Sequence, residues 1–463
     1  AALSHVMGAY AVGVMSLGAP ECLVVAKRGA GSVVLGLGAG ETFVASDVPA
    51  LLPYTRDVIV LEDDDVAVIS AAGAALSSLD GHPVAREPAR IAWDAAMAEK
   101  GHYPHFMLKE IYEQPRAIAD TFRGRVSIDD GDVMLPELAD ASGVTDVDRV
   151  VLVACGTAYH AAMLGRAMVE RFAGLPAEVE LASEFRYRDA VVGARTLVIA
   201  VSQSGETADT IGAVKAARAK GCPVIAVTNV MGSALAREAT AVVSMQAGPE
   251  IGVASTKAFV TMLVALYLFG LWLGRERGAL TPRDIAKSVA DLVEVPALVE
   301  KALEVEAAMA ALAREVATAR SVLYLGRGHQ HAIALEGALK LKEISYIHAE
   351  GYAGGEMKHG PIALVTDGLP VVALAPRDGA YDRMAGNIEE VRARGARVIA
   401  VTNAGDDRVA ATADVVVEVP ATAELLAPLV TVVPLQFLAY HVAVGLGRDV
   451  DRPRNLAKSV TVE

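Results

Sequence analysis

The feature that most constrains the fold of this chain is an internal repeat. The six residues Val-Ile-Ala-Val-Thr-Asn occur at 224–229 and again at 398–403. Short β-branched runs alternate with helical stretches around each copy, from Val150 onward and again from Val322 to Val419. This alternation is typical of a doubly wound parallel sheet. We therefore predict two α/β domains of one origin, with the cleft between them as the natural ligand site.

A loop rich in hydroxyl groups follows the strand-like run Leu197–Val201 of the first repeat. Residues 202–210 read Ser-Gln-Ser-Gly-Glu-Thr-Ala-Asp-Thr, and a helical pattern follows them. The first N–H groups of a helix lack partners within it and the helix dipole attracts an anion, so this loop suits a phosphate group. The same residue types are also common helix caps, and their spacing alone leaves both interpretations open.

The second repeat helps to separate the two interpretations. Alignment of the two copies on the repeated hexapeptide pairs four polar residues of the first copy with four residues of the second. Ser202, Gln203, Ser204 and Thr207 correspond to Pro376, Arg377, Asp378 and Tyr381. The second copy has therefore lost the hydroxyl cluster and gained a carboxylate, which suits a phosphate poorly. A structural cap could occur in both copies, whereas a single ligand site would occur in one. The difference favours a phosphate site in the first repeat only.

The second repeat and the C-terminal tail carry further chemical groups. Residues 336–345 are predicted to form a helix on which Lys340 and Glu343 project from one side. Such a pair is either a surface ion pair, which contributes little, or a carboxylate base beside an ammonium group. The segment 350–361 is predicted to be a Gly-rich loop and contains His359, and the tail 449–463 contains Lys458. Taken alone, these are as consistent with a solvated loop and a frayed terminus as with a site.

Composition argues against several classes of protein. A net charge of -14 disfavours nucleic-acid binding, which requires a basic face. The three cysteines, Cys22, Cys155 and Cys222, form no CxxC motif and no even set, so we predict a reducing, cytoplasmic location and no metal site. The apolar run Ala258–Leu273 is shorter than the ~20 residues that span a bilayer. We interpret it as a helix in a domain core or a subunit contact, and we expect no membrane association.

The remaining segments complete the predicted domain division. Residues 1–95 contain short apolar runs separated by Gly, Pro and Asp turns, which is an antiparallel β pattern. The rest divides into a helical linker (96–140), a first α/β domain (141–285), a connecting helix (286–315) and a second α/β domain with the tail (316–463). The chain begins at Ala1 without an initiator Met, and we interpret it as a fragment or a processed chain.

Five motifs together give the chain a resemblance to a known family. They are Ser-Gln-Ser-Gly-Glu-Thr-Ala-Asp-Thr (202–210), Gly-Val-Ala-Ser-Thr-Lys (252–257), the 336–345 helix, Lys-His-Gly-Pro (358–361) and Arg-Asn-Leu-Ala-Lys-Ser-Val-Thr-Val-Glu (454–463). In this order they resemble the glutamine–fructose-6-phosphate aminotransferase (isomerising), or glucosamine-6-phosphate synthase, family. The resemblance covers nearly the whole chain. It implies two sugar-isomerase (SIS) domains with parallel sheets, preceded at residues 1–95 by part of an Ntn-type glutaminase domain.

The resemblance also implies roles for particular residues. Four would hold the phosphate of fructose 6-phosphate: Ser202, Gln203, Ser204 and Thr207. Two would lie near the sugar: Thr157 and Ser255. His359, supplied by the second subunit of a homodimer, would open the sugar ring, and Lys458 would form an imine at C2. Glu343, aided by Lys340, would move a proton between C1 and C2. No cofactor or metal is expected. Family enzymes have a serine where this chain has Ala158, so one polar contact is expected to be missing.

One departure from the family pattern affects the expected nitrogen source. The family hydrolyses glutamine with a cysteine at the mature N-terminus of its glutaminase domain, and none of the three cysteines here can replace it. We therefore expect synthesis of glucosamine 6-phosphate with ammonia, or isomerisation only, without glutamine hydrolysis by these residues. Two alternatives are a phosphosugar isomerase or deglycase on the same double domain, and a sugar-phosphate-sensing module without chemistry. The glutaminase-like segment and the match of the C-terminal tail to the family weigh against the isomerase or deglycase alternative. The presence of Glu343, His359 and Lys458 weighs against the second.

Overall fold

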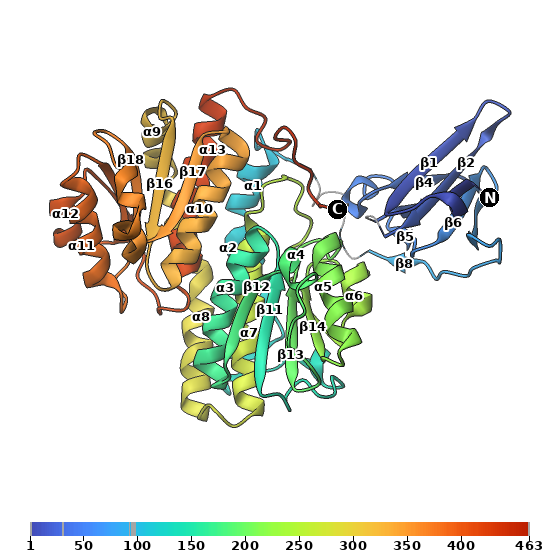
Figure 1. Cartoon of the computed structure of the whole chain (residues 1–463), viewed down its shortest axis with the longest axis horizontal. Helices are drawn as coiled ribbons and strands as arrows, with labels where there is room; N and C mark the ends of the chain where they lie inside the picture. The colour runs from blue at the N-terminus through green and yellow to red at the C-terminus, as the bar shows by residue number, and fades with distance from the viewer. Residues whose placement is uncertain (1, 30–31, 92, 94–98, 462–463) are drawn as a thin grey trace.

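The computed structural model describes residues 2–29, 32–91, 93 and 99–461, which form an N-terminal β part and two α/β parts (Figure 1). The β part opens with the 3-10 helix η1 (Ala2–His5) and holds two antiparallel sheets. One has the order β1-β2-β6-β7, with β1 (Tyr10–Ser16), β2 (Ala19–Arg28), β6 (Asp65–Ser70) and β7 (Gly73–Ser78). The other has the order β4-β3-β5-β8, with β3 (Val34–Leu37), β4 (Thr42–Ala45), η2 (Val48–Ala50), β5 (Asp57–Val60) and β8 (Ala89–Arg90).

The two N-terminal sheets share one hydrophobic core. Val25 of β2, Leu35 of β3, Ile59 of β5 and Ile69 of β6 are all buried in it. The antiparallel pattern that the sequence predicts for this region is therefore confirmed. Strand β7 is not evident from its sequence, because Gly, Ala and Ser favour strands only weakly. Its pairing along β6 supplies the backbone hydrogen bonds that its side chains do not predict.

The first α/β domain is a five-stranded parallel sheet of order β12-β11-β13-β14-β15. Its strands are β11 (Arg149–Ala154), β12 (Ala177–Leu181), β13 (Thr196–Val201), β14 (Val224–Thr228) and β15 (Ala241–Ser244). Its helices are α3 (Thr157–Ala173), α4 (Ala182–Phe185), α5 (Ala208–Ala219), α6 (Ala234–Glu238) and α7 (Lys257–Glu276). Alternate side chains of β13 enter different cores: Leu197, Ile199 and Val201 share one with α3 and α7, while Val198 and Ala200 pack with α5. Both faces of the sheet are covered, as in other parallel sheets.

The second α/β domain repeats this topology, with the strand order β17-β16-β18-β19-β20. Its strands are β16 (Ser321–Gly326), β17 (His348–Ala353), β18 (Pro370–Ala375), β19 (Arg397–Asn403) and β20 (Val415–Val419). Its helices are α10 (His329–Ser345), η6 (Gly354–His359), η7 (Pro361–Leu364), α11 (Tyr381–Arg392), α12 (Asp407–Thr412) and α13 (Ala427–Gly445). The repeated hexapeptide forms β14 in one domain and β19 in the other. The predicted fold class, two repeated doubly wound α/β domains after a β-rich region, is confirmed.

The segments between these parts are mainly helical. The linker holds α1 (Phe106–Tyr112) and α2 (Gln114–Phe122), followed by the short strands β9 (Val126–Ser127) and β10 (Asp132–Val133) and by η4 (Pro136–Leu138). Between the α/β domains, α8 (Pro282–Ala302) starts at a capping box formed by Thr281 and Asp284, as the sequence predicts. The single connecting helix expected at 286–315 is instead most of α8, the turn η5 (Leu303–Val305) and most of α9 (Glu306–Val316). The break allows α9 to pack against α13.

Two expectations about single segments need correction. The predicted Gly-rich loop at 350–361 is largely structured, because residues up to Ala353 pair with β16 and 3-10 turns follow. The apolar run is a longer helix than its sequence suggests, α7, and Lys257 through Gly274 are buried within this chain. It is therefore a core helix and is not available as the subunit contact. Among the described residues, α7 and α13 are long and apolar enough to cross a membrane, but both lie mostly buried inside the protein.

Candidate active site

A buried polar cluster joins the two α/β domains where α3 meets α10. Thr157 stands at the first turn of α3, after Gly156 with a φ of 56°, and α10 contributes Glu336, Lys340 and Glu343. The Lys340 ammonium group lies 2.7 Å from a Glu343 oxygen and 3.4 Å from a Glu336 oxygen, and it donates to the Thr157 hydroxyl at 3.1 Å. Thr157 in turn donates to Glu336 at 3.0 Å. The structure thus brings three of the residues singled out from the sequence into one cluster.

Burial separates this cluster from an ordinary surface ion pair. The Lys340 side chain is only 1% exposed, so the interpretation of Lys340 and Glu343 as a surface pair is wrong. Burial by itself lowers the pKa of Lys340, but the adjacent carboxylates of Glu343 and Glu336 outweigh it and raise that pKa. Lys340 therefore remains an ammonium group throughout the physiological range. Glu343, with 22% of its side chain exposed, is the member of the pair that a ligand can reach.

Two members of the cluster were not singled out as functional from the sequence. Glu336 is fully buried and accepts a hydrogen bond from Nδ1 of His160 on α3 at 2.7 Å. Burial raises the pKa of Glu336, but Lys340 and His160 outweigh this effect and hold it below its usual range. The signals available were weak: Glu336 opens the 336–345 motif, and His160 lies one helical turn after Thr157. Neither spacing indicates that the two side chains meet.

The hydroxyl-rich loop lies between β13 and α5, as expected. The Ser202 hydroxyl accepts from the Gly205 N–H at 3.1 Å and lies 3.0 Å from the Thr207 hydroxyl, and the Ser204 hydroxyl accepts from the Glu206 N–H. Gly205 has a φ of +66°, and a Cβ there would lie 2.1 Å from the Ser233 hydroxyl oxygen, so the turn requires glycine. Within the described residues, the backbone N–H groups of Gln203, Ser204 and Thr207 donate to no protein acceptor. They are suited to an anion.

The corresponding loop of the second domain is closed by its own side chains. The Asp378 carboxylate accepts from the Ala380 N–H at 2.8 Å, and the Arg377 N–H donates to the Asn403 side chain at 2.7 Å. The Tyr381 hydroxyl donates to Asp406 at 2.5 Å. These contacts occupy groups that an anion would need, and they agree with the loss of hydroxyl residues in the second copy.

The C-terminal tail is anchored over the first domain rather than frayed. After α13 it crosses towards the N-terminal sheets (Figure 1). The Lys458 ammonium group donates to Glu250 at 2.5 Å and to the Gly252 carbonyl at 2.7 Å, and the Val460 carbonyl accepts from the Ala208 N–H at the start of α5. The tail therefore places Lys458 in the first domain, beside the helix that follows the hydroxyl-rich loop.

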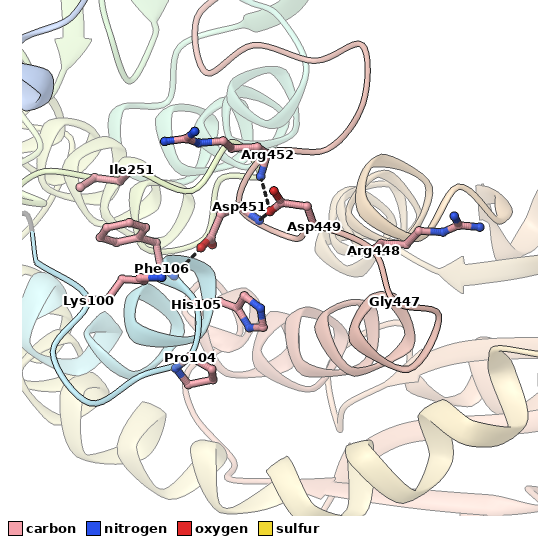
Figure 2. A pocket seen from close by; sticks show the side chains of 10 residues that line it. All are labelled: Lys100, Pro104, His105, Phe106, Ile251, Gly447, Arg448, Asp449, Asp451 and Arg452. Carbon is pink, nitrogen blue, oxygen red and sulfur yellow. Dashed lines mark hydrogen bonds between the residues drawn. The ribbon is translucent and has the colours of Figure 1, made fainter.

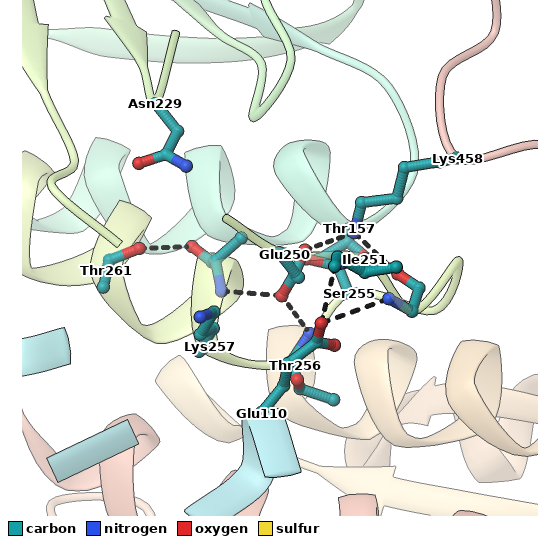
Figure 3. Close-up of polar contacts among 12 residues, drawn as sticks. Glu110, Thr157, Asn229, Glu250, Ile251, Ser255, Thr256, Lys257, Thr261 and Lys458 are labelled. Atoms are coloured by element: carbon teal, nitrogen blue, oxygen red, sulfur yellow. Dashed lines mark hydrogen bonds and ion pairs between the residues drawn. The ribbon is translucent and has the colours of Figure 1, made fainter. Parts of the chain in front are cut away.

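Lys458 is received by a buried carboxylate that the sequence did not single out. Glu250 accepts from the Ser255 hydroxyl at 3.1 Å and from the N–H groups of Thr256 and Ala258, both at 2.9 Å (Figure 3). Burial raises the pKa of Glu250, but Lys458 and these N–H groups outweigh it and hold the pKa below its usual value. Ser255 is thus tied to the Lys458 partner. Ser255 belongs to the motif 252–257, which begins two residues after Glu250. This proximity was the only feature of the sequence that pointed to Glu250.

His359 is not part of these clusters in the single chain. It ends η6 and is exposed, and in the described part of the chain no hydrogen bond or ion pair joins it to the other candidate residues. Ala158, the second residue of α3, is buried and offers no side-chain polar group. Among the described residues no group of three or more His, Cys, Asp and Glu side chains could hold a metal ion.

Two cavities lie beside candidate residues. A small one of about 30 Å³ is lined by Ser204, Ser459 and Thr461 together with residues of the N-terminal sheets. A larger one of about 580 Å³ lies between the start of α1 and the start of the tail, and Phe106, Ile251 and Asp451 line it (Figure 2). The geometry of the buried polar groups locates the candidate chemistry better than cavity size does.

Comparisons with known proteins agree with this arrangement. The SIS domain family model matches residues 144–271 and 315–445. The glutamine–fructose-6-phosphate aminotransferase (isomerising) of Thermus thermophilus is 52% identical over 462 residues, covering 100% of this chain and 76% of the relative. The solved C-terminal domain of glucosamine-fructose-6-phosphate aminotransferase from Francisella tularensis is 42% identical with a TM-score of 0.74, covering 77% of this chain and 99% of that one. Glucosamine-6-phosphate deaminase from Thermotoga maritima, at 22% identity, a TM-score of 0.59 and coverage of 77% and 99%, shares the fold.

Proposed function

The chain belongs to the glutamine–fructose-6-phosphate aminotransferase (isomerising) family, and on this premise we propose that its α/β domains make glucosamine 6-phosphate from fructose 6-phosphate and ammonia. The observation that carries the proposal is the buried Lys340, which bridges Thr157 of the first domain to Glu336 and Glu343 of the second. A module that only senses sugar phosphate has no need to bury the Lys340 and Glu336 charges beside the partly exposed carboxylate of Glu343, because burying charge is costly.

The phosphate of the substrate binds the hydroxyl-rich loop in this proposal. The donors offered to the phosphate are the N–H groups of Gln203, Ser204 and Thr207 and the hydroxyls of Ser202, Ser204 and Thr207. Thr157 and Ser255 lie near the sugar, and both already donate to buried carboxylates. The sugar therefore lies between the first turn of α5 and the Lys340 cluster.

The chemistry follows from the residue types at the site. His359, contributed by a second copy of the chain, assists ring opening by proton transfer. The neutral amine of Lys458 attacks C2 of the open ketose, a C=N bond forms and water leaves, and ammonia later displaces the lysine. Glu343 takes the proton from C1 and returns it to C2, which converts the ketose skeleton to the aldose skeleton. Lys340 keeps Glu343 in position through the 2.7 Å ion pair.

Three further expectations belong to this proposal. A homodimer rests on the exposed position of His359 alone, since the buried α7 no longer supports it. A cytoplasmic location and the domain boundaries at 95, 140, 285 and 315 are retained as proposals. An isomerase without aminotransfer is the second candidate function, because Glu343 could act on the free ketose when Lys458 is not engaged.

The nitrogen source is tested with the purified 463-residue chain. We expect fructose 6-phosphate alone to give glucose 6-phosphate, and added ammonium at a pH that yields free ammonia to give glucosamine 6-phosphate. Glutamine should give no more amino sugar than the reaction without nitrogen, because amide hydrolysis needs an activated nucleophile. Both products are measured by mass spectrometry. Robust synthesis from glutamine would refute the proposed nitrogen source, and no conversion under any condition would refute the enzymatic proposal.

The phosphate site is tested by removing its hydroxyl groups. We expect Ser204→Ala combined with Thr207→Ala to weaken binding of fructose 6-phosphate by about 1–3 kcal/mol, the usual cost of unpaired buried polar groups. Isothermal titration calorimetry measures the affinity. Thr318→Ala, which removes an exposed hydroxyl that follows α9 and donates to the Glu315 carbonyl, is the control and should bind normally. An unchanged affinity in the double variant would exclude the loop as the phosphate site.

A further inference from the structure

The linker helix α1 inserts a buried carboxylate beneath the loop that receives Lys458. Glu110 is 2% exposed, and its Oε1 accepts from the N–H groups of Ile251 at 2.6 Å and Gly252 at 3.1 Å. The carbonyl of the same Gly252 accepts from Lys458 at 2.7 Å. Glu110 and Lys458 therefore hold opposite sides of one short loop, and Figure 3 shows Glu110 and Lys458 approaching that loop from different elements. No sequence motif links these two residues, which lie near opposite ends of the α/β region.

The fit between Glu110 and this loop is close. A Cβ on Gly252 would lie 2.9 Å from Oε2 of Glu110, so a larger residue there would displace the Glu110 carboxylate. The tail anchors the same corner, because Asp451 accepts from the first N–H groups of α1, those of Phe106 and Met107, both at 2.9 Å. Movement of α1, the loop or the tail would disturb two of these three contacts.

In the described part of the chain no ion pair joins Glu110 to a cation, although several charged groups surround it. The Lys257 ammonium group pairs with Glu113 at 2.6 Å and the Lys458 ammonium group pairs with Glu250 at 2.5 Å. Lys109, which precedes Glu110 on α1, also pairs with Glu113 at 3.4 Å, and the tail's Asp451 is bonded to backbone N–H groups, so each of the three lysines pairs with a carboxylate other than that of Glu110. Its Oε2 is buried and, within the described residues, has no hydrogen-bond partner. An ionised oxygen in that position would be unfavourable.

The electrostatic environment favours the protonated form of Glu110. Burial and the neighbouring Glu250 raise the pKa of Glu110 to about 7, against the opposing attraction of Lys458 and Lys257 and the hydrogen bond from Ile251. Glu110 therefore stays protonated at pH values at which an ordinary glutamate has lost its proton, and it ionises only as the pH rises through about 7. The cavity lined by Ile251, Phe106 and Asp451 lies beside the loop and gives solvent a route to this corner (Figure 2).

We propose that Glu110 is a positioning residue for Lys458: it fixes the Gly252 carbonyl that receives the lysine, and its proton controls how firmly the lysine is held as an ammonium ion. With the proton in place, one carboxylate, Glu250, holds Lys458. With the proton lost, a second negative charge stabilises the ammonium form and opposes release of the neutral amine that must attack C2. The inference rests on the proposed function, because it concerns the imine at Lys458.

The test measures imine formation directly. The full chain is incubated with fructose 6-phosphate and sodium cyanoborohydride between pH 6 and 9, and the reduced adduct on the Lys458 peptide is quantified by mass spectrometry. Glu110→Gln keeps an oxygen for the two N–H groups but never ionises. We expect the midpoint of its trapping profile to move to lower pH by about half a unit or more. Glu300→Gln, an exposed carboxylate on α8, is the control and should leave the midpoint unchanged.

Each outcome decides a different point. An adduct in the unaltered protein with the same midpoint in Glu110→Gln would overturn this inference alone. No adduct on Lys458 in the unaltered protein would overturn both this inference and the proposed imine chemistry. If Glu110→Gln does not fold, the unaltered protein labelled with [δ-13C]glutamate answers the question by NMR. One glutamate carboxyl carbon should titrate near pH 7, whereas titration of all of them below about pH 5.5, the ordinary range for Glu, would overturn the inference.

Discussion

Glu343→Gln is expected to reduce both sugar reactions, isomerisation and ammonium-dependent synthesis, by about 10²–10⁴-fold, the usual contribution of a positioned acid–base group. An amide has nearly the size of a carboxyl group but cannot accept the C1 proton. The pair with Lys340 is also weakened, because a buried ammonium then faces a neutral partner at the 2.7 Å position. Glu336 and Thr157 still contact Lys340, so the fold should be retained. Product formation by mass spectrometry measures both reactions.

Measuring substrate affinity distinguishes the loss of the catalytic base from the loss of the substrate-binding site. In Glu343→Gln, calorimetry should show nearly unchanged affinity for fructose 6-phosphate, because the proposed phosphate-binding loop lies on another domain. Glu389→Gln, which alters an exposed carboxylate on α11 of the same domain, is the matched control and should keep full activity. Full activity in Glu343→Gln would refute its assignment as the base. Lost binding in that variant would instead indicate a structural role.

Lys458→Arg is expected to remove ammonium-dependent synthesis by at least about 10³-fold, because a guanidinium group forms no imine and loss of a covalent catalyst removes most of the rate. Arginine remains charged and can still face Glu250, so the buried carboxylate is not left unpaired. Isomerisation to glucose 6-phosphate should fall less than synthesis, since Glu343 can still act on the free ketose. The ratio of the two rates is the measurement.

This variant has its own control and its own contrary result. Lys358→Arg changes an exposed lysine that pairs with Glu390 in the second domain, and it should leave both rates unchanged. If Lys458→Arg kept its synthesis rate, imine chemistry at Lys458 would be excluded. If it lost synthesis and isomerisation equally, Lys458 would be a part of the common binding site and not a nucleophile.

The sequence by itself determined the repeated α/β fold and the position of the hydroxyl-rich loop. Both depend on local patterns: β-branched runs such as Leu197–Val201 form buried strands, and a hydroxyl-rich segment between a strand and a helix lies at the N-terminus of that helix. The comparison of Ser204 with Asp378 was possible because the two copies share one topology. Residues with a family motif around them, such as Lys340 and Lys458, could be named before their surroundings were known.

Only the tertiary structure decided what surrounds these residues. Lys340 and Glu343 have the spacing of a surface pair, and it is the packing of α3 against α10 that removes Lys340 from water. Similarly, α7 has the composition of a core helix and of a subunit contact, and its burial by neighbouring helices selects the first. Glu110, Glu250 and Lys458 come from three distant segments, so no periodicity relates them. Desolvation and charge pairing depend on distances in space, and sequence patterns report only neighbours along the chain.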